Sequence, residues 1–207
     1  MKLLSFSDRI SASTAAASWL ATELDRALAQ AGNVGLIVSG GSTPGYCLSL
    51  LSEADIDWHR VQVSLTDERC VPVTDSASNE KMVRETLLRL AAADASFRQV
   101  GELETSNIVC SLVGMGEDGH FASIFPDNPR LAELLDPGSP PLSFSVSTVG
   151  SEYKRRTVNL SYLLQGDAVA LLVFGEAKKR IIDNSDGFPV AALLKQACIP
   201  VHVFWAP

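Results

Sequence analysis

The chain has 207 residues, of which 46% are hydrophobic, and this is enough apolar material for one substantial core. Its formal net charge of -7 argues against a nucleic-acid-binding surface, which normally carries a basic stripe, and against attachment to an anionic membrane face. We therefore expect one domain, residues 1–207, that binds neither nucleic acid nor a membrane.

The N-terminal stretch and the cysteines argue against export and against a metal centre. Asp8 and Arg9 interrupt the first apolar stretch, and the longest later apolar run, AVALLVF, is far too short to cross a bilayer. The cysteines lack the close paired spacing that zinc sites and disulfide frameworks use; they are Cys47, Cys70, Cys110 and Cys198. We expect a cytoplasmic protein without a bound metal ion.

Helical periodicity alternates along the chain with short apolar runs. The predicted elements, in chain order, are a helix over 7–29, the strand VGLIVS, a helix over 44–52, the strand VQVSL, a helix over 79–92, and the strands NIVCSLV, VALLVF and VHVFW. This alternation is typical of an α/β fold with a mostly parallel sheet and helices on both faces. The stretch DPGSPPL, residues 136–142, is expected to be a loop within the same domain.

Three of the predicted strands end in polar sequence. VGLIVS is followed by GGSTPG, VQVSL by TDER and NIVCSLV by GMGEDGH. In an open parallel sheet, ligands bind outside the carboxyl ends of the strands. We therefore expect these three segments to converge on one crevice.

The first strand end has the residue types of an anion-binding turn. Gly40, Gly41, Ser42 and Thr43 lie where a strand passes into a helix whose first turn holds Pro44. Exposed backbone N–H groups and the positive end of a helix dipole attract phosphate, and glycine allows close approach. The sequence is neither a Walker loop nor a dinucleotide fingerprint. A tight turn with an ordinary helix cap is the alternative interpretation.

The other two strand ends carry titratable side chains. TDER places Asp67 beside Arg69, and taken alone this segment is better explained by an exposed salt bridge in a turn. GMGEDGH places Glu117 and Asp118 before His120, among glycines that free the backbone. An isolated histidine more often has a structural role, but flanking acids and nearby N–H donors are what a general base requires. We therefore favour a catalytic role for His120.

Five segments, in this order, carry a resemblance to a known family. GGSTPG, TDERCVP followed by SN, GMGEDGHFASIFP, KRRTVNL and GEAKK resemble the 6-phosphogluconolactonases within the glucosamine-6-phosphate isomerase superfamily. The resemblance extends over nearly the whole chain. It implies a modified Rossmann-type sheet, a phosphorylated sugar as substrate, and no metal or organic cofactor.

Within this superfamily the histidine segment resembles the lactonases more than the isomerases. The deaminase-isomerase branch reads GHIAFNEP, with a glutamate five positions after the histidine that helps to open the sugar ring. Here that position is Phe125, in an IFP ending that resembles the lactonase LFP. Lactonases usually have threonine where this chain has Phe121, so we expect a hydroxyl near the site to be lost. The chain is also short for the family over 103–107 and after Asp183.

The resemblance assigns roles in substrate binding. We expect the sugar phosphate to lie against the glycine, serine and threonine turn. The resemblance favours Arg156 of KRRTVNL and Lys178 of GEAKK as its charged partners, with Arg69 as a third candidate, and the choice among these and Arg155 stays open. Asn79 is expected either to contact the sugar or to tie down the loop after TDER. The full set of expected substrate-binding residues is Gly40, Gly41, Ser42, Thr43, Arg69, Asn79, Gly116, Arg156 and Lys178.

The catalytic residues expected from the resemblance are His120 and Asp67. Neutral His120 would take a proton from a water that attacks the lactone carbonyl, and backbone N–H groups over 114–119 could stabilise the oxyanion. Asp67 occupies the position of the superfamily's proton-abstracting aspartate, but in a lactonase it could merely orient a water or a sugar hydroxyl.

The expected activity is hydrolysis of 6-phospho-D-glucono-1,5-lactone to 6-phosphogluconate, in the oxidative pentose phosphate pathway. Two alternatives stay open: an isomerase or deaminase acting on glucosamine 6-phosphate, and a sugar-phosphate-binding protein without turnover. The sequence does not indicate the oligomeric state.

Overall fold

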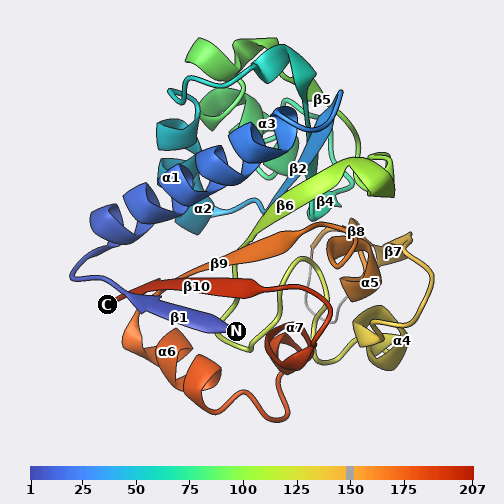
Figure 1. The fold of residues 1–207 in the computed structure, drawn as a ribbon. Helices are drawn as coiled ribbons and strands as arrows, with labels where there is room; N and C mark the ends of the chain where they lie inside the picture. The colour runs from blue at the N-terminus through green and yellow to red at the C-terminus, as the bar shows by residue number, and fades with distance from the viewer. Residues whose placement is uncertain (148–151) are drawn as a thin grey trace.

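The computed structural model describes residues 1–147 and 152–207 and contains one large sheet between two layers of helices (Figure 1). Seven strands form the sheet in the order β1-β10-β9-β6-β2-β3-β5, and all neighbouring pairs are parallel. The strands are β1 (Lys2–Ser5), β2 (Val34–Val38), β3 (Val61–Leu65), β5 (Ser96–Phe97), β6 (Ile108–Val113), β9 (Ala168–Phe174) and β10 (Val201–Ala206). The predicted α/β class with a mostly parallel sheet is confirmed.

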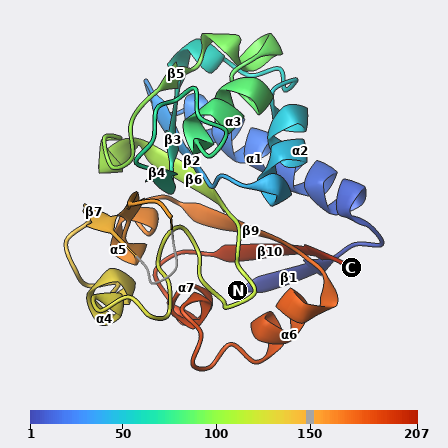
Figure 2. The ribbon, with the colours of Figure 1, turned by 180° about the vertical axis from the view of Figure 1, so that it is seen from behind.

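Helices cover both faces of this sheet. The helices of the chain's first half lie on one face and those that follow β9 lie on the other, in both views (Figures 1 and 2). The first set is α1 (Arg9–Leu28), α2 (Ser42–Leu51) and α3 (Asn79–Thr86), and the second is α6 (Glu176–Asp183) and α7 (Val190–Lys195). The central strands β2 and β6 are consequently buried along their whole length, which explains why their sequences are continuous apolar runs.

The longest helix, α1, shows how local sequence and packing agree. The Asp8 side chain accepts a hydrogen bond from the Ser11 backbone N–H and so caps the helix start. Buried residues then recur every three to four positions, including Ala16, Leu20 and Leu24. This face packs on β6, β9 and β10, so α1 holds the centre of the sheet from one side.

The structure confirms one predicted loop and shortens one predicted helix. Residues 136–142 contain no helix or strand, as expected. The helix predicted over 79–92 is wrong at its C-terminal end, because α3 stops at Thr86 and a separate 3-10 helix follows at Leu90–Asp94. Leu90 has a φ of 52°, a left-handed conformation that an α-helix cannot contain. Two other 3-10 helices are Trp58–Arg60 and Thr105–Asn107.

A second, three-stranded antiparallel sheet was not predicted. Its order is β4-β8-β7, formed by β4 (Asp67–Arg69), β8 (Arg155–Val158) and β7 (Ser143–Val146), with α4 (Leu131–Leu135) and α5 (Leu160–Leu163) near it. Only Thr66 separates β3 from β4, so the chain leaves the large sheet and enters the small one at the TDER segment. The small sheet therefore presents TDER and KRRTV side by side.

In the part of the chain that the structure describes, no helix combines the length and the apolar character that a membrane crossing needs.

Candidate active site

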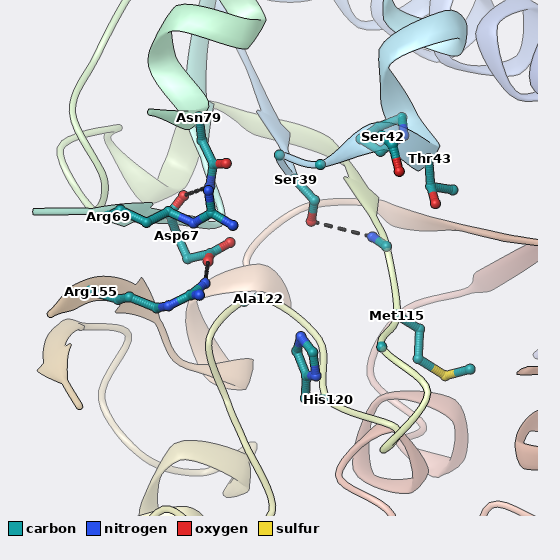
Figure 3. Close-up of a pocket in the computed structure, with 15 residues that line it drawn as sticks. Ser39, Ser42, Thr43, Asp67, Arg69, Asn79, Met115, His120, Ala122 and Arg155 are labelled. Carbon is teal, nitrogen blue, oxygen red and sulfur yellow. Dashed lines mark hydrogen bonds and ion pairs between the residues drawn. The ribbon is translucent and has the colours of Figure 1, made fainter. Parts of the chain in front are cut away.

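The three polar strand ends converge on one cavity of about 220 Å³ (Figure 3). Figure 3 shows Asp67, Arg69 and Arg155 on one side of it and Ser42 and Thr43 on the other, with the His120 ring between the two sides. The lining consists of Ser39, Gly40, Gly41, Ser42, Thr43, Pro44, Asp67, Arg69, Asn79, Gly114, Met115, Gly116, His120, Ala122 and Arg155. Of the expected site residues, Arg156 and Lys178 do not belong to this lining.

One wall of the cavity is the N-terminus of α2. Gly41 precedes the helix with a φ of 98° and offers no side chain to cap the first turn, which begins with Ser42 and Thr43. The first N–H groups of a helix have no partner within it, and the helix dipole adds positive potential there. This wall therefore has the chemistry of an anion-binding site.

Asn79 holds the loop after TDER against this wall. Its amide Nδ2 donates to the Asp67 carbonyl at 2.9 Å, and its side chain lies so close to Gly40 that a Cβ there would come within 2.0 Å of Oδ1. The Glu68 carboxylate accepts from the backbone N–H groups of Asn79 and Glu80 and thereby caps α3. Of the two roles expected for Asn79, the structure shows contacts that tie down the loop.

Asp67 is buried, with 6% of its surface exposed, and its carboxylate lies at the meeting point of three segments. Oδ1 accepts the Thr66 hydroxyl at 2.8 Å, and Oδ2 accepts the Ser123 hydroxyl. An Arg155 guanidinium nitrogen lies 3.9 Å from Oδ2. These contacts fix the carboxylate at the cavity wall.

Arg69 and Arg155 each carry a buried polar atom without a partner among the described residues. Arg69 Nη1 donates to the Ala77 carbonyl, but the buried Nε atoms of both arginines have no hydrogen-bond acceptor among the described residues. Burial lowers the pKa of Arg155, as does the charge of Arg69, and Asp67 only partly offsets this. Because unpaired buried donors are costly, the two guanidinium groups suit an anion supplied by a ligand.

Arg155, and not its neighbour Arg156, lines the cavity. Successive side chains on a strand point to opposite faces, so of the two arginines on β8 only Arg155 faces the cavity. Arg156 donates to the Ser143 hydroxyl at 3.1 and 2.9 Å and lines a separate hollow. Lys178 lies on α6, outside the cavity lining. The alternation in KRRTV is a signal that could have identified Arg155, once the segment is assigned to a strand.

His120 is paired with Asp118. The ring Nδ1 lies 2.5 Å from Asp118 Oδ1, which also accepts the His120 backbone N–H at 3.2 Å. Partial burial alone raises the pKa of the Asp118 carboxyl, but the hydrogen bond and charge of His120 outweigh it, so the pKa is lowered. A carboxylate only accepts, which assigns the proton to Nδ1 and leaves the Nε2 lone pair for another partner.

The glycines of this loop make room for the pair rather than offering free N–H groups. A Cβ on Gly116 would come within 2.3 Å of the His120 ring. The Gly116 N–H donates to the His120 carbonyl, that of Gly119 to the Gly116 carbonyl, and that of Gly114 to the Ser39 hydroxyl. These three N–H groups already donate within the protein, so the structure does not support the expected contacts from them to an oxyanion.

The two phenylalanines of the histidine segment have different surroundings. Phe121 is fully buried in the core, so its replacement of threonine does not place a phenyl ring in the cavity. Phe125 contacts the His120 ring, with the centroids 4.2 Å apart, and the Arg155 guanidinium carbon lies 5.4 Å from its ring centre. Between them Ala122 adopts a φ of 49°, a conformation that is uncommon outside glycine and concentrates at functional sites.

Among the described residues, no group of three or more histidine, cysteine, aspartate or glutamate side chains is arranged to hold a metal ion.

Comparison with known proteins identifies the family. Two overlapping segments, residues 7–108 and 89–203, match the family described as glucosamine-6-phosphate isomerases/6-phosphogluconolactonase. The chain belongs to this family. The resemblance of its sequence motifs is thereby confirmed at the family level.

Two similar family members align with the whole length of the chain. A protein of Caulobacter vibrioides named 6-phosphogluconolactonase is 37% identical, over 100% of this chain and 97% of its own length. The crystal structure of a 6-phosphogluconolactonase from Shewanella baltica superposes with a TM-score of 0.90 at 30% identity, and covers 100% of this chain and 98% of its own.

The fold by itself does not separate the two branches of the family. A structure described as a monomeric glucosamine-6-phosphate deaminase superposes with a TM-score of 0.75 over 98% of this chain and 97% of its own, at 15% identity. The side chains of the cavity must therefore distinguish a lactonase from a deaminase.

Proposed function

We propose that the protein is a 6-phosphogluconolactonase, which hydrolyses 6-phospho-D-glucono-1,5-lactone to 6-phosphogluconate in the pentose phosphate pathway. The observation that carries this proposal is the Asp118–His120 pair, whose histidine lines a cavity that also holds two guanidinium groups. The names of the similar family members support the same activity. A cytoplasmic location is part of this proposal.

The phosphate is assigned to the wall formed by Gly40, Gly41, Ser42 and Thr43. Its charge would be balanced by guanidinium groups of the same cavity, with Arg155 taking the place expected for Arg156 and with Arg69 beside it. A dianionic substrate needs such local positive charge because the protein has a net charge of -7.

Two of the expected substrate-binding residues, Asn79 and Gly116, form part of the cavity wall around the proposed sugar site. The Asn79 Nδ2 and the Gly116 backbone N–H and carbonyl already bond within the protein. We assign both to shaping the site, and we make no assignment for Lys178, which lies outside the lining.

His120 is assigned as the general base. Asp118 holds the Nδ1 proton, so Nε2 accepts a proton from water as the water oxygen bonds to the lactone carbonyl carbon. The tetrahedral intermediate then breaks its bond to the ring oxygen, which takes the proton from Nε2. The product is the open-chain acid, whose ionisation releases one proton to solution. General base catalysis typically contributes about 100-fold to 10,000-fold.

Phe125 favours hydrolysis over isomerisation. Isomerisation moves protons between neighbouring carbons and the ring oxygen, and by resemblance the isomerase branch uses a carboxylate at this position. A phenyl ring that packs against His120 cannot carry a proton. Lactone hydrolysis needs no second acid there, since one histidine can both accept and return the proton.

Substrate comparison tests the activity. The protein should release acid from freshly generated 6-phosphogluconolactone faster than the spontaneous reaction, and should release no ammonia from glucosamine 6-phosphate. Ammonia release would move the protein to the deaminase branch. Binding of 6-phosphogluconate without any turnover of the lactone would make it a non-catalytic binding protein.

A further inference from the structure

Buried hydroxyl groups connect the ends of two central strands to Asp67. Ser39 follows β2 and Thr66 follows β3, and their hydroxyl oxygens lie 3.0 Å apart. Thr66 Oγ1 lies 2.8 Å from Asp67 Oδ1, and the Gly114 backbone nitrogen lies 3.3 Å from Ser39 Oγ. Both hydroxyl residues are buried, so these groups depend on one another for hydrogen bonds.

The groups at the two ends of this hydrogen-bonded series, the Gly114 N–H and the Asp67 carboxylate, fix the direction of every hydrogen bond in it. The Gly114 N–H can only donate, and the Asp67 carboxylate can only accept. Thr66 must therefore give its one proton to Asp67, and Ser39 must give its proton to Thr66. The whole chain of donors points toward the Asp67 carboxylate.

A second hydroxyl reaches Asp67 from the histidine loop. Ser123 is fully buried, donates to Oδ2, and is itself held because its backbone N–H donates to the Thr157 hydroxyl at 3.1 Å. Each carboxylate oxygen thus receives one hydroxyl donor from a different side. The carboxylate cannot rotate without breaking one of these bonds, and its remaining acceptor capacity faces the cavity that it lines.

We propose that Thr66 and Ser123 are positioning residues that hold Asp67 as a fixed acceptor for a hydroxyl group of the sugar. On this basis, which rests on the proposed lactonase function, Asp67 contributes to substrate binding and not to proton abstraction. Two hydroxyl donors hold the Asp67 carboxylate in place, whereas His120 Nε2 has no hydrogen-bond partner among the described residues and is the group free to take the proton. Arg155 and Arg69 are the charged groups that face Asp67 from β8 and β4.

This assignment predicts a particular kinetic signature. A hydroxyl acceptor contacts the substrate equally before and during the reaction, and losing such uniform binding raises KM while leaving kcat unchanged. A proton-abstracting or water-activating Asp67 would instead lower kcat when its support is removed.

The test is Thr66→Val, which removes the hydroxyl and keeps the shape of the side chain. We expect KM for the lactone to rise about tenfold, with kcat within about twofold of wild type. The affinity for 6-phosphogluconate, measured by calorimetry, should fall by a similar factor. Thr66→Ser restores the hydroxyl and should restore KM.

Ser64→Ala is the matched control. Ser64 lies on β3, two residues before Thr66, is equally buried, and donates to the Gln99 carbonyl at 3.0 Å, away from Asp67. Its loss should lower stability without changing KM. If Thr66→Val does not fold, Ser123→Ala removes the other donor and should give the same rise in KM.

Two outcomes would overturn the proposal. The first is a fall in kcat with KM unchanged in Thr66→Val, which would place Asp67 in the chemical step. The second is a KM equal to that of the Ser64→Ala control. A wild-type protein without lactonase activity would instead refute the proposed function, so the two failures are distinguishable.

Discussion

The contact between Asp118 and His120 depends on glycine at two nearby positions. Gly116 has no room for a Cβ because the His120 ring lies against its Cα. Gly119 has a φ of 74°, and a Cβ there would come within 2.7 Å of Phe188. The sequence indicated that these glycines free the backbone, and the structure shows which side chains fill the space that they leave.

Replacing Asp118 should lower kcat more than replacing Glu117, the neighbouring residue with the same charge. Asp118→Asn removes the charge that stabilises a protonated imidazole, so kcat should fall about tenfold or more with little change in KM. Glu117→Gln alters the adjacent exposed acid and serves as the control. Steady-state kinetics of both variants check this, and equal effects would contradict a specific role for Asp118.

The lowered pKa of Asp118 also fixes the sign of a pH effect on stability. A carboxyl whose folded pKa lies below its ordinary value of 3.8 contributes stability above that value, and loses the contribution as the pH falls through the folded pKa. The free energy of unfolding of wild type minus that of Asp118→Asn should therefore shrink between about pH 6 and pH 3. Denaturant unfolding at both pH values measures it, and a difference that grows in acid would contradict the assignment.

At the scale of elements, the small antiparallel sheet decides which basic residue enters the site. β4 pairs with β8 so that Asp67 lies opposite Thr157 and Arg69 opposite Arg155. Composition and periodicity could not predict this sheet, because its strands are three or four residues long and two of them, β4 and β8, are rich in charged residues. For the same reason the motif pointed to Arg156, which lies outside the cavity lining: which side chains of a strand share a face can be read only after the strand itself is known.

The alternation on β8 provides a matched pair of variants. Arg155→Met should raise KM for the lactone by about tenfold to a hundredfold, because it removes a guanidinium group from the cavity. Arg156→Met removes the neighbouring charge on the opposite face and should change KM by less than about threefold. Kinetics of the two variants at one ionic strength check this, and a larger effect from Arg156→Met would contradict the placement.

Two glycines near the start of α2 should respond oppositely to alanine. Gly40→Ala would force the Asn79 amide away, because the new Cβ comes within 2.0 Å of Oδ1, and should destabilise the fold by about 1–3 kcal/mol. Gly45→Ala meets only Thr86 Cγ2 at 4.0 Å and should stabilise the helix by about 0.5–1 kcal/mol. Denaturant unfolding measures both, and a neutral Gly40→Ala would contradict the packing of Asn79.

Across the whole molecule, the apolar pattern of the sequence predicted the strands that are buried in the interior of the large sheet. The five predicted strands became β2, β3, β6, β9 and β10, which form the interior of the large sheet. The edge strands β1 and β5 were missed because they are short and half-exposed, so their sequences carry little apolar signal. The convergence of three strand ends on one cavity followed from topology. Coordinates were needed to identify Arg155 in its wall and the buried Ser123 that supports Asp67.

The most direct test of the account compares hydrolysis of freshly generated 6-phosphogluconolactone by wild type, His120→Ala and His59→Ala. His59 is a second histidine close to an acid, with its Nε2 3.3 Å from Asp94, but it lies on the surface away from the cavity. Acid release above the spontaneous rate should be rapid in wild type and in His59→Ala, and should fall at least about a hundredfold in folded His120→Ala. Retained activity in His120→Ala, or a wild-type rate equal to the background, would contradict the account.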